Sequence, residues 1–193
     1  MEIDPKEIKG AWDAGYVLDR HTISSTMIGY NEFGHPDFDT HRSPLGELIY
    51  KLKYKSDKAA LPTIVEGVAK FVANWGIRPD LIVPIPPSKQ RAFQPVVEIA
   101  AQLGAALNVP VDVSSLKKKA TTSQMKDVGN FTDRVKALEA VFASGKEFKG
   151  KKVLLIDDLF QSGATMNVAA RVIREQGEAM AIYALALTRT RGQ

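Results

Sequence analysis

The residues best suited to chemistry lie between Val153 and Thr165, in the stretch VLLIDDLFQSGAT. Its apolar part predicts a buried strand that ends in two adjacent carboxylates, Asp157 and Asp158, before a polar loop and a new helix. In open α/β sheets, ligands bind beyond the carboxyl ends of the strands. A helix that begins there presents unpaired N–H groups and the positive end of its dipole, so we expect this stretch to bind an anion.

The polar residues of this stretch indicate which anion it would bind. Gly163 lets the backbone wrap closely, and the hydroxyls of Ser162 and Thr165 add donors, so the loop is suited to a phosphate monoester. The two carboxylates suit ligand hydroxyls or a hydrated magnesium ion. A phosphorylated ribose carries a phosphate for the loop and hydroxyls for the carboxylates. The alternative, that the carboxylates only end a strand and Gly163 only caps a helix, is less favourable because unpaired charge at such a place costs free energy.

The composition excludes several other kinds of site. The 193 residues include no cysteine, which excludes disulfides, thiolate zinc sites and thiol nucleophiles. The three histidines, His21, His35 and His41, all lie in the first quarter of the chain, so a histidine cluster could be built only there. The formal net charge of +4 favours an anionic partner; nucleic acid, a membrane surface and a phosphorylated small molecule all stay open.

The sequence offers no signal for a membrane or for secretion. No apolar run approaches the roughly 20 residues that a membrane-spanning helix needs. The first ten residues, MEIDPKEIKG, have neither a basic segment nor an apolar one, and so differ from a secretory signal. We therefore expect a cytoplasmic protein without a membrane partner.

Predicted helices and strands alternate along most of the chain. Apolar residues at helical spacing predict four helices, from Ser43-Pro44 through Leu52 and at 64–75, 96–107 and 166–173. Short apolar runs predict strands at 16–23, 81–83, 111–113, 140–143, 153–156 and 180–187. Because the main strands are apolar on both faces, we expect an α/β fold with an open, mainly parallel, twisted sheet flanked by helices.

A change in composition near residue 57 predicts a division of the chain. We expect residues 1–57 to form an N-terminal appendage and residues 58–193 to form the core. Residues 114–134 are polar and without period, and ordered loops of that length often serve as lids or binding loops.

The stretch VLLIDDLFQSGAT resembles the phosphoribosyl pyrophosphate (PRPP) signature of the type I phosphoribosyltransferases. The chain further resembles the ComF-like, competence-associated branch of that family over roughly residues 45–190. The segment Tyr50–Asp57 is similar to the lysine- and tyrosine-containing helix end of that branch. Ile82–Pro86 with Arg91–Phe93 is similar to its pyrophosphate-binding strand and turn, and Thr122–Gln124 with Arg134 to its flexible loop.

The chain departs from the family pattern at three places. Gln161 stands where a hydroxyl residue is usual. The turn at Arg91–Pro95 lacks the glycine, asparagine and glutamine expected there. Because the chain has no cysteine, the four-cysteine zinc module common in that branch has no counterpart in residues 1–44.

The resemblance implies a fold, a reaction and a set of site residues. It implies a phosphoribosyltransferase core with the N-terminal appendage as a small hood. It implies Mg²⁺-dependent transfer of ribose-5-phosphate from PRPP to an unidentified base-like or amine acceptor, with release of pyrophosphate; magnesium would be bound mainly through the ligand and waters. The implied residues are the catalytic pair Asp157 and Asp158 at the ribose hydroxyls, Ser162, Gly163, Ala164 and Thr165 at the 5′-phosphate, and Ser88, Lys89, Arg91, Lys117 and Lys118 at the pyrophosphate.

Two other functions fit the same residues. The first is a non-catalytic regulator that senses PRPP or a nucleotide, favoured by the unusual turn at Arg91–Pro95 and the unusual N-terminal segment. The second is an accessory protein for DNA uptake or processing, which rests on the ComF analogy and the mild positive charge. The resemblance also leaves a homodimer open, since relatives are often dimers.

Overall fold

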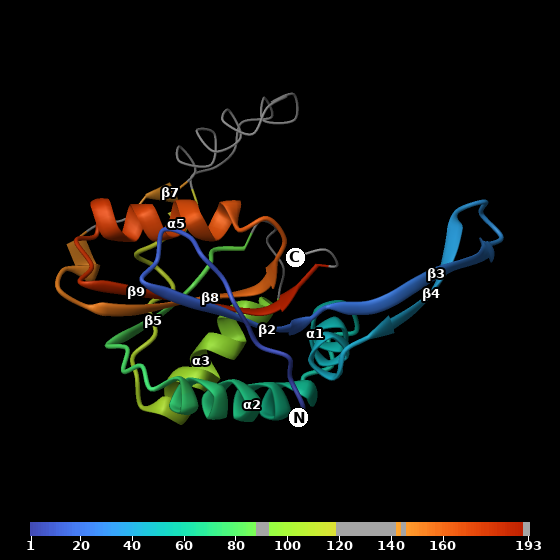
Figure 1. Cartoon of the computed structure of the whole chain (residues 1–193), viewed down its shortest axis with the longest axis horizontal. Helices are drawn as coiled ribbons and strands as arrows, with labels where there is room; N and C mark the ends of the chain where they lie inside the picture. The colour runs from blue at the N-terminus through green and yellow to red at the C-terminus, as the bar shows by residue number, and fades with distance from the viewer. Residues whose placement is uncertain (88–92, 119–141, 144–145, 191–193) are drawn as a thin grey trace, which may run out of the picture.

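The centre of the molecule is a five-stranded sheet, seen in the computed structural model, which describes residues 1–87, 93–118, 142–143 and 146–190 (Figure 1). Its strands are β1 (Lys6–Glu7), β2 (Ala14–Arg20), β5 (Leu81–Pro84), β8 (Lys152–Phe160) and β9 (Ala181–Arg189). They lie in the order β1–β2–β9–β8–β5; β1 is antiparallel to β2 and all other neighbours are parallel. The expected α/β class with a mainly parallel sheet is therefore confirmed.

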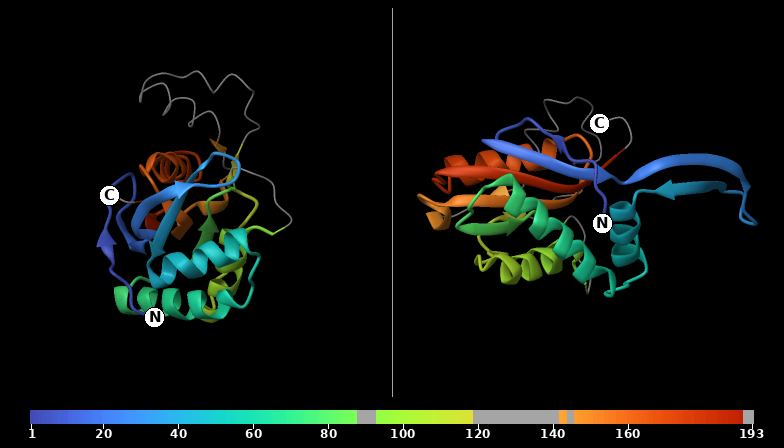
Figure 2. Two further views of the ribbon diagram at one scale, coloured as in Figure 1. Left: turned by 90° about the vertical axis from the view of Figure 1, so that its right-hand side faces the viewer. Right: turned by 60° about the horizontal axis from the view of Figure 1, so that its bottom comes forward.

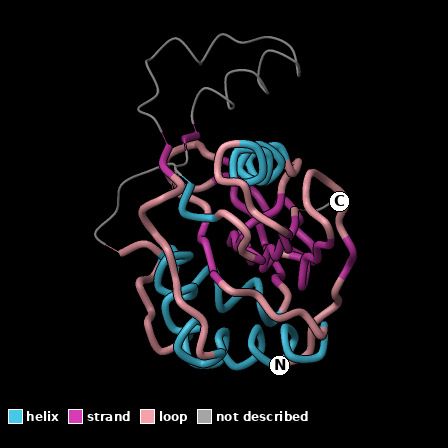
Figure 3. Tube along the Cα trace, turned by 90° about the vertical axis from the view of Figure 1, so that its left-hand side faces the viewer, coloured by secondary structure: helices cyan, strands magenta, loops and turns pink. Residues whose placement is uncertain are grey.

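Helices cover both faces of this sheet (Figure 3). The helices α1 (Pro44–Tyr54), α2 (Ala60–Trp75) and α3 (Pro95–Leu107) pack on one face, and α5 (Ala164–Glu175) packs on the other. Along β8, Val153 and Leu155 join the core beneath α5, while Leu154 and Ile156 join the opposite core. Burial on both faces explains why this strand is apolar at every position from 153 to 156.

The helix ends agree with the signals in the sequence. The Ser43 side chain caps α1 by accepting a hydrogen bond of 3.0 Å from the backbone N–H of Gly46. Gly76 (φ 75°) follows α2 and Asn108 (φ 54°) follows α3, both in the left-handed conformation that ends many helices. None of the helices in the described ranges is long and apolar enough to cross a membrane.

The expected strand at 111–113 is reduced in the structure, and the expected strand at 140–143 lies within the described residues only at positions 142 and 143. In the segment 111–113, Val111 forms only an isolated bridge to Ile82. The strand β7 covers Phe142–Ala143 and pairs with β6 (Lys117–Lys118), close to a 3₁₀ turn at Lys146–Phe148. Most of the expected loop at 114–134 lies outside the described residues.

The N-terminal segment contributes directly to the sheet and its core. The strand β2, between β1 and β9, completes the sheet. Leu45, Ile49 and Leu52 of α1 are buried in the same core as Leu18 of β2. The division of the chain at residue 57 stays a prediction, but β2 and α1, which lie before it, pack into the same core as the helices and strands after it.

A β-hairpin projects from this body beyond the carboxyl ends of the parallel strands (Figures 1 and 2). It consists of β3 (Thr22–Tyr30) and β4 (Pro36–Arg42), which pair antiparallel, and we call residues 22–42 the arm. The sequence predicts one strand over 16–23, whereas the structure has β2 and the start of β3 there and adds the unforeseen strand β4.

The hydroxyl of Ser43 joins the base of the arm to α1, and its removal should be measurable. Its oxygen accepts from Gly46 N–H and donates to the backbone carbonyl of Arg20, and the residue is 2% exposed. Ser43→Ala leaves the buried Gly46 N–H and the Arg20 carbonyl without this partner, so we expect urea denaturation to show a loss of about 1–2 kcal/mol in unfolding free energy. The control Ser25→Ala removes an exposed hydroxyl and should change stability by less than about 0.5 kcal/mol; equal losses would contradict the assignment.

Candidate functional site

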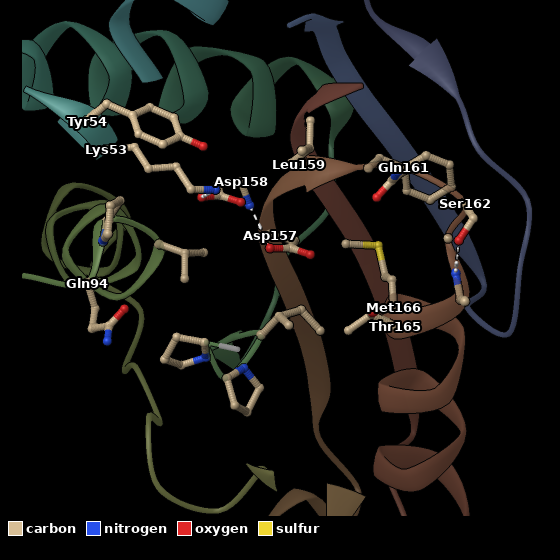
Figure 4. Close-up of a pocket in the computed structure, with 18 residues that line it drawn as sticks. Lys53, Tyr54, Gln94, Asp157, Asp158, Leu159, Gln161, Ser162, Thr165 and Met166 are labelled. Atoms are coloured by element: carbon tan, nitrogen blue, oxygen red, sulfur yellow. Dashed lines mark hydrogen bonds and ion pairs between the residues drawn. The ribbon is translucent and has the colours of Figure 1, made fainter. Parts of the chain in front are cut away.

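A pocket of about 390 Å³ lies at the carboxyl end of β8, next to the start of α5 (Figure 4). One wall comes from the end of α1, a second from the residues after β5 and the start of α3, and a third from β8 and the loop that leads into α5. The lining residues are Lys53, Tyr54, Ile85, Pro86, Pro87, Gln94, Pro95, Val96 and the continuous run from Asp157 to Met166.

Asp157 and Asp158 lie inside β8 rather than after it. The sequence predicts a strand that ends at the acid pair, but β8 continues to Phe160 because β9 runs beside it to Arg189. Successive side chains of a strand point to opposite faces, so the two carboxylates enter the pocket from different sides. Both residues are half-buried, and Asp157 Oδ1 accepts a hydrogen bond of 2.8 Å from the backbone N–H of Asp158.

Lys53 is a pocket residue that the sequence analysis did not assign to the site. Its Nζ lies 2.8 Å from Oδ2 of Asp158, and the two side chains are only 21% and 14% exposed (Figure 4). One signal for it exists in the sequence: Lys53 follows the buried Ile49 by four residues, which places both on the same side of α1. The ion pair neutralises one carboxylate and fixes the last turn of α1 against the sheet.

The loop at 161–163 leads into α5 along a path that requires glycine. Gly163 has a φ of 73°, and a Cβ there would lie 2.7 Å from the ring of Phe160. Asn167 holds the turn: its side-chain amide donates to the Gly163 carbonyl at 3.0 Å, and its Oδ1 accepts from the N–H of Ala11 at 2.8 Å. Ser162 Oγ accepts a weak bond of 3.4 Å from the N–H of Ala164. The first turn of α5 therefore points its N–H groups toward the pocket.

The residues implied for the pyrophosphate are only partly within the described chain. Ser88, Lys89 and Arg91 lie outside the described residues. Lys117 is exposed in β6 and is not among the described residues that line the pocket, and Lys118 follows it in the same strand. The structure thus brings the acid pair and the residues at 162–165 together in one pocket, while the roles of these residues, like those of the other five, stay predictions.

A small polar network lies behind the acid pair. The Thr188 hydroxyl donates to the backbone carbonyl of Asp158 at 2.9 Å, and Nδ1 of His21 lies 3.2 Å from the same hydroxyl oxygen. Because the single hydroxyl proton goes to Asp158, the His21 ring nitrogen is the donor to Thr188. Burial lowers the pKa of His21, and the nearby positive charges of Arg42 and Lys53 lower it further.

The donor atoms of the pocket fit a magnesium ion that is bound chiefly by its ligand. Within the described residues, no group of three or more His, Asp or Glu side chains could hold a metal ion. The pocket instead offers two carboxylates, of which Asp158 is also paired with Lys53. Magnesium commonly takes one or two protein carboxylates and completes its shell with waters and phosphate oxygens.

Comparison with known families and proteins gives consistent results. Residues 56–193 match the phosphoribosyl transferase domain family. The competence protein ComFC of Bacillus subtilis is 25% identical over 155 residues, which are 78% of this chain and 62% of that protein. The chain thus spans about three fifths of the length of this relative. The match agrees with the ComF-like resemblance of the sequence.

Solved structures share the fold. Glutamine PRPP amidotransferase from B. subtilis, complexed with ADP and GMP, has a TM-score of 0.51 at 17% identity, with 81% of this chain and 34% of that chain covered. Adenine phosphoribosyltransferase from Leishmania tarentolae has a TM-score of 0.50 at 11% identity, with 97% and 95% covered. At sequence identities this low, the similarity shows that the fold is shared and nothing beyond the fold.

The lowered pKa of His21 predicts a dependence of stability on pH. Below its usual pKa of 6.5 the unfolded chain takes up a proton that the folded protein resists, so the unfolding free energy falls as the pH drops through that range. We expect His21→Gln to remove this part of the pH profile, measured by urea denaturation between about pH 5 and pH 8. His35→Gln, at an exposed position on the arm, is the control; identical profiles for wild type and His21→Gln would contradict the account.

Proposed function

Because the chain belongs to the phosphoribosyl transferase domain family, we propose that its pocket binds PRPP and transfers ribose-5-phosphate to an acceptor. The acceptor atom forms a bond to the anomeric carbon while the bond from that carbon to pyrophosphate breaks, and pyrophosphate leaves with the electron pair. The observation that supports this most is that the acid pair and the start of α5 line one pocket. A sugar with a phosphate at one end has hydroxyls for the carboxylates and an anion for the start of the helix.

In this proposal the 5′-phosphate binds at residues 162–165. The first turn of α5 offers backbone N–H groups and the positive end of the helix dipole, both of which favour an anion. Ser162 and Thr165 add hydroxyls, and the φ of Gly163 lets the backbone turn close to the phosphate. Gln161 also lines the pocket, but the proposal gives it no phosphate contact.

The carboxylates of Asp157 and Asp158 would bind the ribose hydroxyls. Their negative charge next to the ring also favours the positive charge that develops at the anomeric carbon as the leaving group departs. In this proposal Lys53, 2.8 Å away, neutralises and orients the Asp158 carboxylate, and Asp157 brings a second carboxylate to the same pocket. Magnesium, bound chiefly through the oxygens of the ligand and through waters, would stabilise the charge that develops on the pyrophosphate oxygens.

The pyrophosphate and the acceptor would occupy the remaining sides of the pocket. Ser88, Lys89 and Arg91 follow the wall formed by Pro86 and Pro87, and Lys117 and Lys118 would supply further cations. The acceptor is base-like or an amine in this proposal. Tyr54, which is 59% exposed and lines the pocket, offers an aromatic face to a planar acceptor.

Binding of PRPP tests the proposed site directly. We expect Asp157→Asn combined with Asp158→Asn to weaken binding of PRPP with magnesium by at least about 100-fold in calorimetric titration, because two charge-assisted contacts are lost. Circular dichroism of the variant controls for folding. Unchanged affinity in a folded variant would contradict the assignment of the acid pair.

Turnover is a separate experiment on the same preparation. The wild-type protein is incubated with PRPP, magnesium and purines, pyrimidines or amines while the release of pyrophosphate is followed. We expect release with one class of acceptor and a large loss of rate in the Asp157→Asn, Asp158→Asn variant. Tight binding of PRPP without release of pyrophosphate for any acceptor would contradict the proposed enzymatic activity and favour a PRPP-sensing regulator.

The ion pair of Lys53 gives a prediction with a matched control. Lys53→Met leaves Asp158 without its cation, and we expect about tenfold weaker PRPP binding. Lys55→Met removes the same charge from an exposed position two residues further along and should change affinity less than twofold. Equal losses in the two variants would mean that only the general positive charge matters.

A further inference from the structure

The arm carries most of the exposed apolar surface in the described part of the chain. Within the described residues, ten large apolar side chains are strongly exposed. Six of the ten belong to the arm and have exposed fractions from 46% to 76%: Ile23, Met27, Ile28, Tyr30, Phe33 and Phe38. Single exposed apolar residues need no explanation, but a contiguous group marks an interaction site. A two-stranded hairpin is also only marginally stable by itself in water.

The register of the arm separates an apolar face from an acidic one. Met27 lies opposite Phe38 and Tyr30 lies opposite Pro36, and these four residues share one face because Phe38 and Pro36 are two residues apart. The other face of β4 carries Asp37, Asp39 and His41, of which Asp39 and His41 approach to 3.3 Å. The arm is thus amphipathic, and beyond its base it projects away from the described body of the molecule (Figure 2).

The base of the arm is fixed, so its direction is set before any partner binds. The Arg42 guanidinium lies 3.7 Å from the centre of the Tyr50 ring and 3.6 Å from Glu47, both on α1. The Ser43 hydroxyl connects the ends of β2 and β4 through the Arg20 carbonyl. A surface that is ordered in advance loses less conformational entropy on binding.

Charge changes sign along the arm. The tip carries Glu32 and Asp37, whereas the base carries Arg42, which shares Glu47 of α1 with Lys51 at 3.6 and 3.8 Å. Lys55 follows the end of the same helix. All of these side chains except Arg42 and Glu47 are exposed. Two such arms side by side in opposite directions would bring each acidic tip to the basic base of the other, with Met27 and Phe38 near the middle.

We propose that the arm binds the arm of a second copy of this chain, antiparallel and about a twofold axis. The apolar faces pack on one another at the centre, and the charged ends form two equivalent sets of contacts, as a twofold dimer requires. The carboxylates of the tip disfavour nucleic acid and anionic membranes as occupants. This dimer does not depend on the proposed transfer reaction.

Oligomeric state tests the proposal. Sedimentation equilibrium of the full chain at micromolar concentration should show a dimer. Met27→Ser with Phe38→Ser should weaken dimerisation at least about 100-fold, because the apolar centre is lost. The control Met180→Ser, at a side chain that is 58% exposed outside the arm, should dimerise as the wild type does. A monomeric wild type, or a dimer that survives the arm substitutions, would overturn the proposal.

Charge exchange gives a second, independent readout. Glu32→Lys with Asp37→Lys should weaken the dimer. Adding Lys51→Glu with Lys55→Glu in the same chain should restore it, because the charges of the tip and of the base are then both reversed. Failure of this rescue, in variants whose circular dichroism is unchanged, would overturn the antiparallel arrangement. Arm-dependent binding of the wild-type monomer to phosphatidylserine vesicles would identify a membrane as the occupant and would also overturn it.

Discussion

The ion pair between Lys53 and Asp158 holds the two parts of the pocket together. Lys53 comes from α1, before the segment that matches the family, and Asp158 comes from the central strand β8. Two half-buried charges so close to a hydrophobic core are stable because each neutralises the other. The pair therefore fixes α1 over the carboxyl end of the sheet, and with it the wall formed by Lys53 and Tyr54.

This constraint connects the arm to the pocket. The base of the arm rests on α1 through Arg42 and Tyr50, and His21 and Thr188 lie between that base and the backbone of Asp158. The N-terminal segment thus does more than cover the site, since it supplies a strand to the sheet, a charged residue to the pocket and the projecting arm.

The sequence analysis succeeded where burial dictates residue types. The apolar runs at 81–83, 153–156 and 180–187 are strands because both of their faces are covered, and Ser43, Gly76 and Asn108 mark helix ends. The extension of β8 through the acid pair was missed because pairing with β9 imposes it on poor strand formers. The second strand of the arm was missed because an exposed hairpin has no core-facing alternation.

The location of a bound sugar phosphate would test the central claim most directly. A crystal structure with PRPP or ribose-5-phosphate and magnesium should have the terminal phosphate against the N–H groups of residues 162–165. The ribose hydroxyls should lie at the carboxylates of Asp157 and Asp158. A phosphate bound elsewhere, with the start of α5 closed by protein side chains, would contradict the account of this pocket.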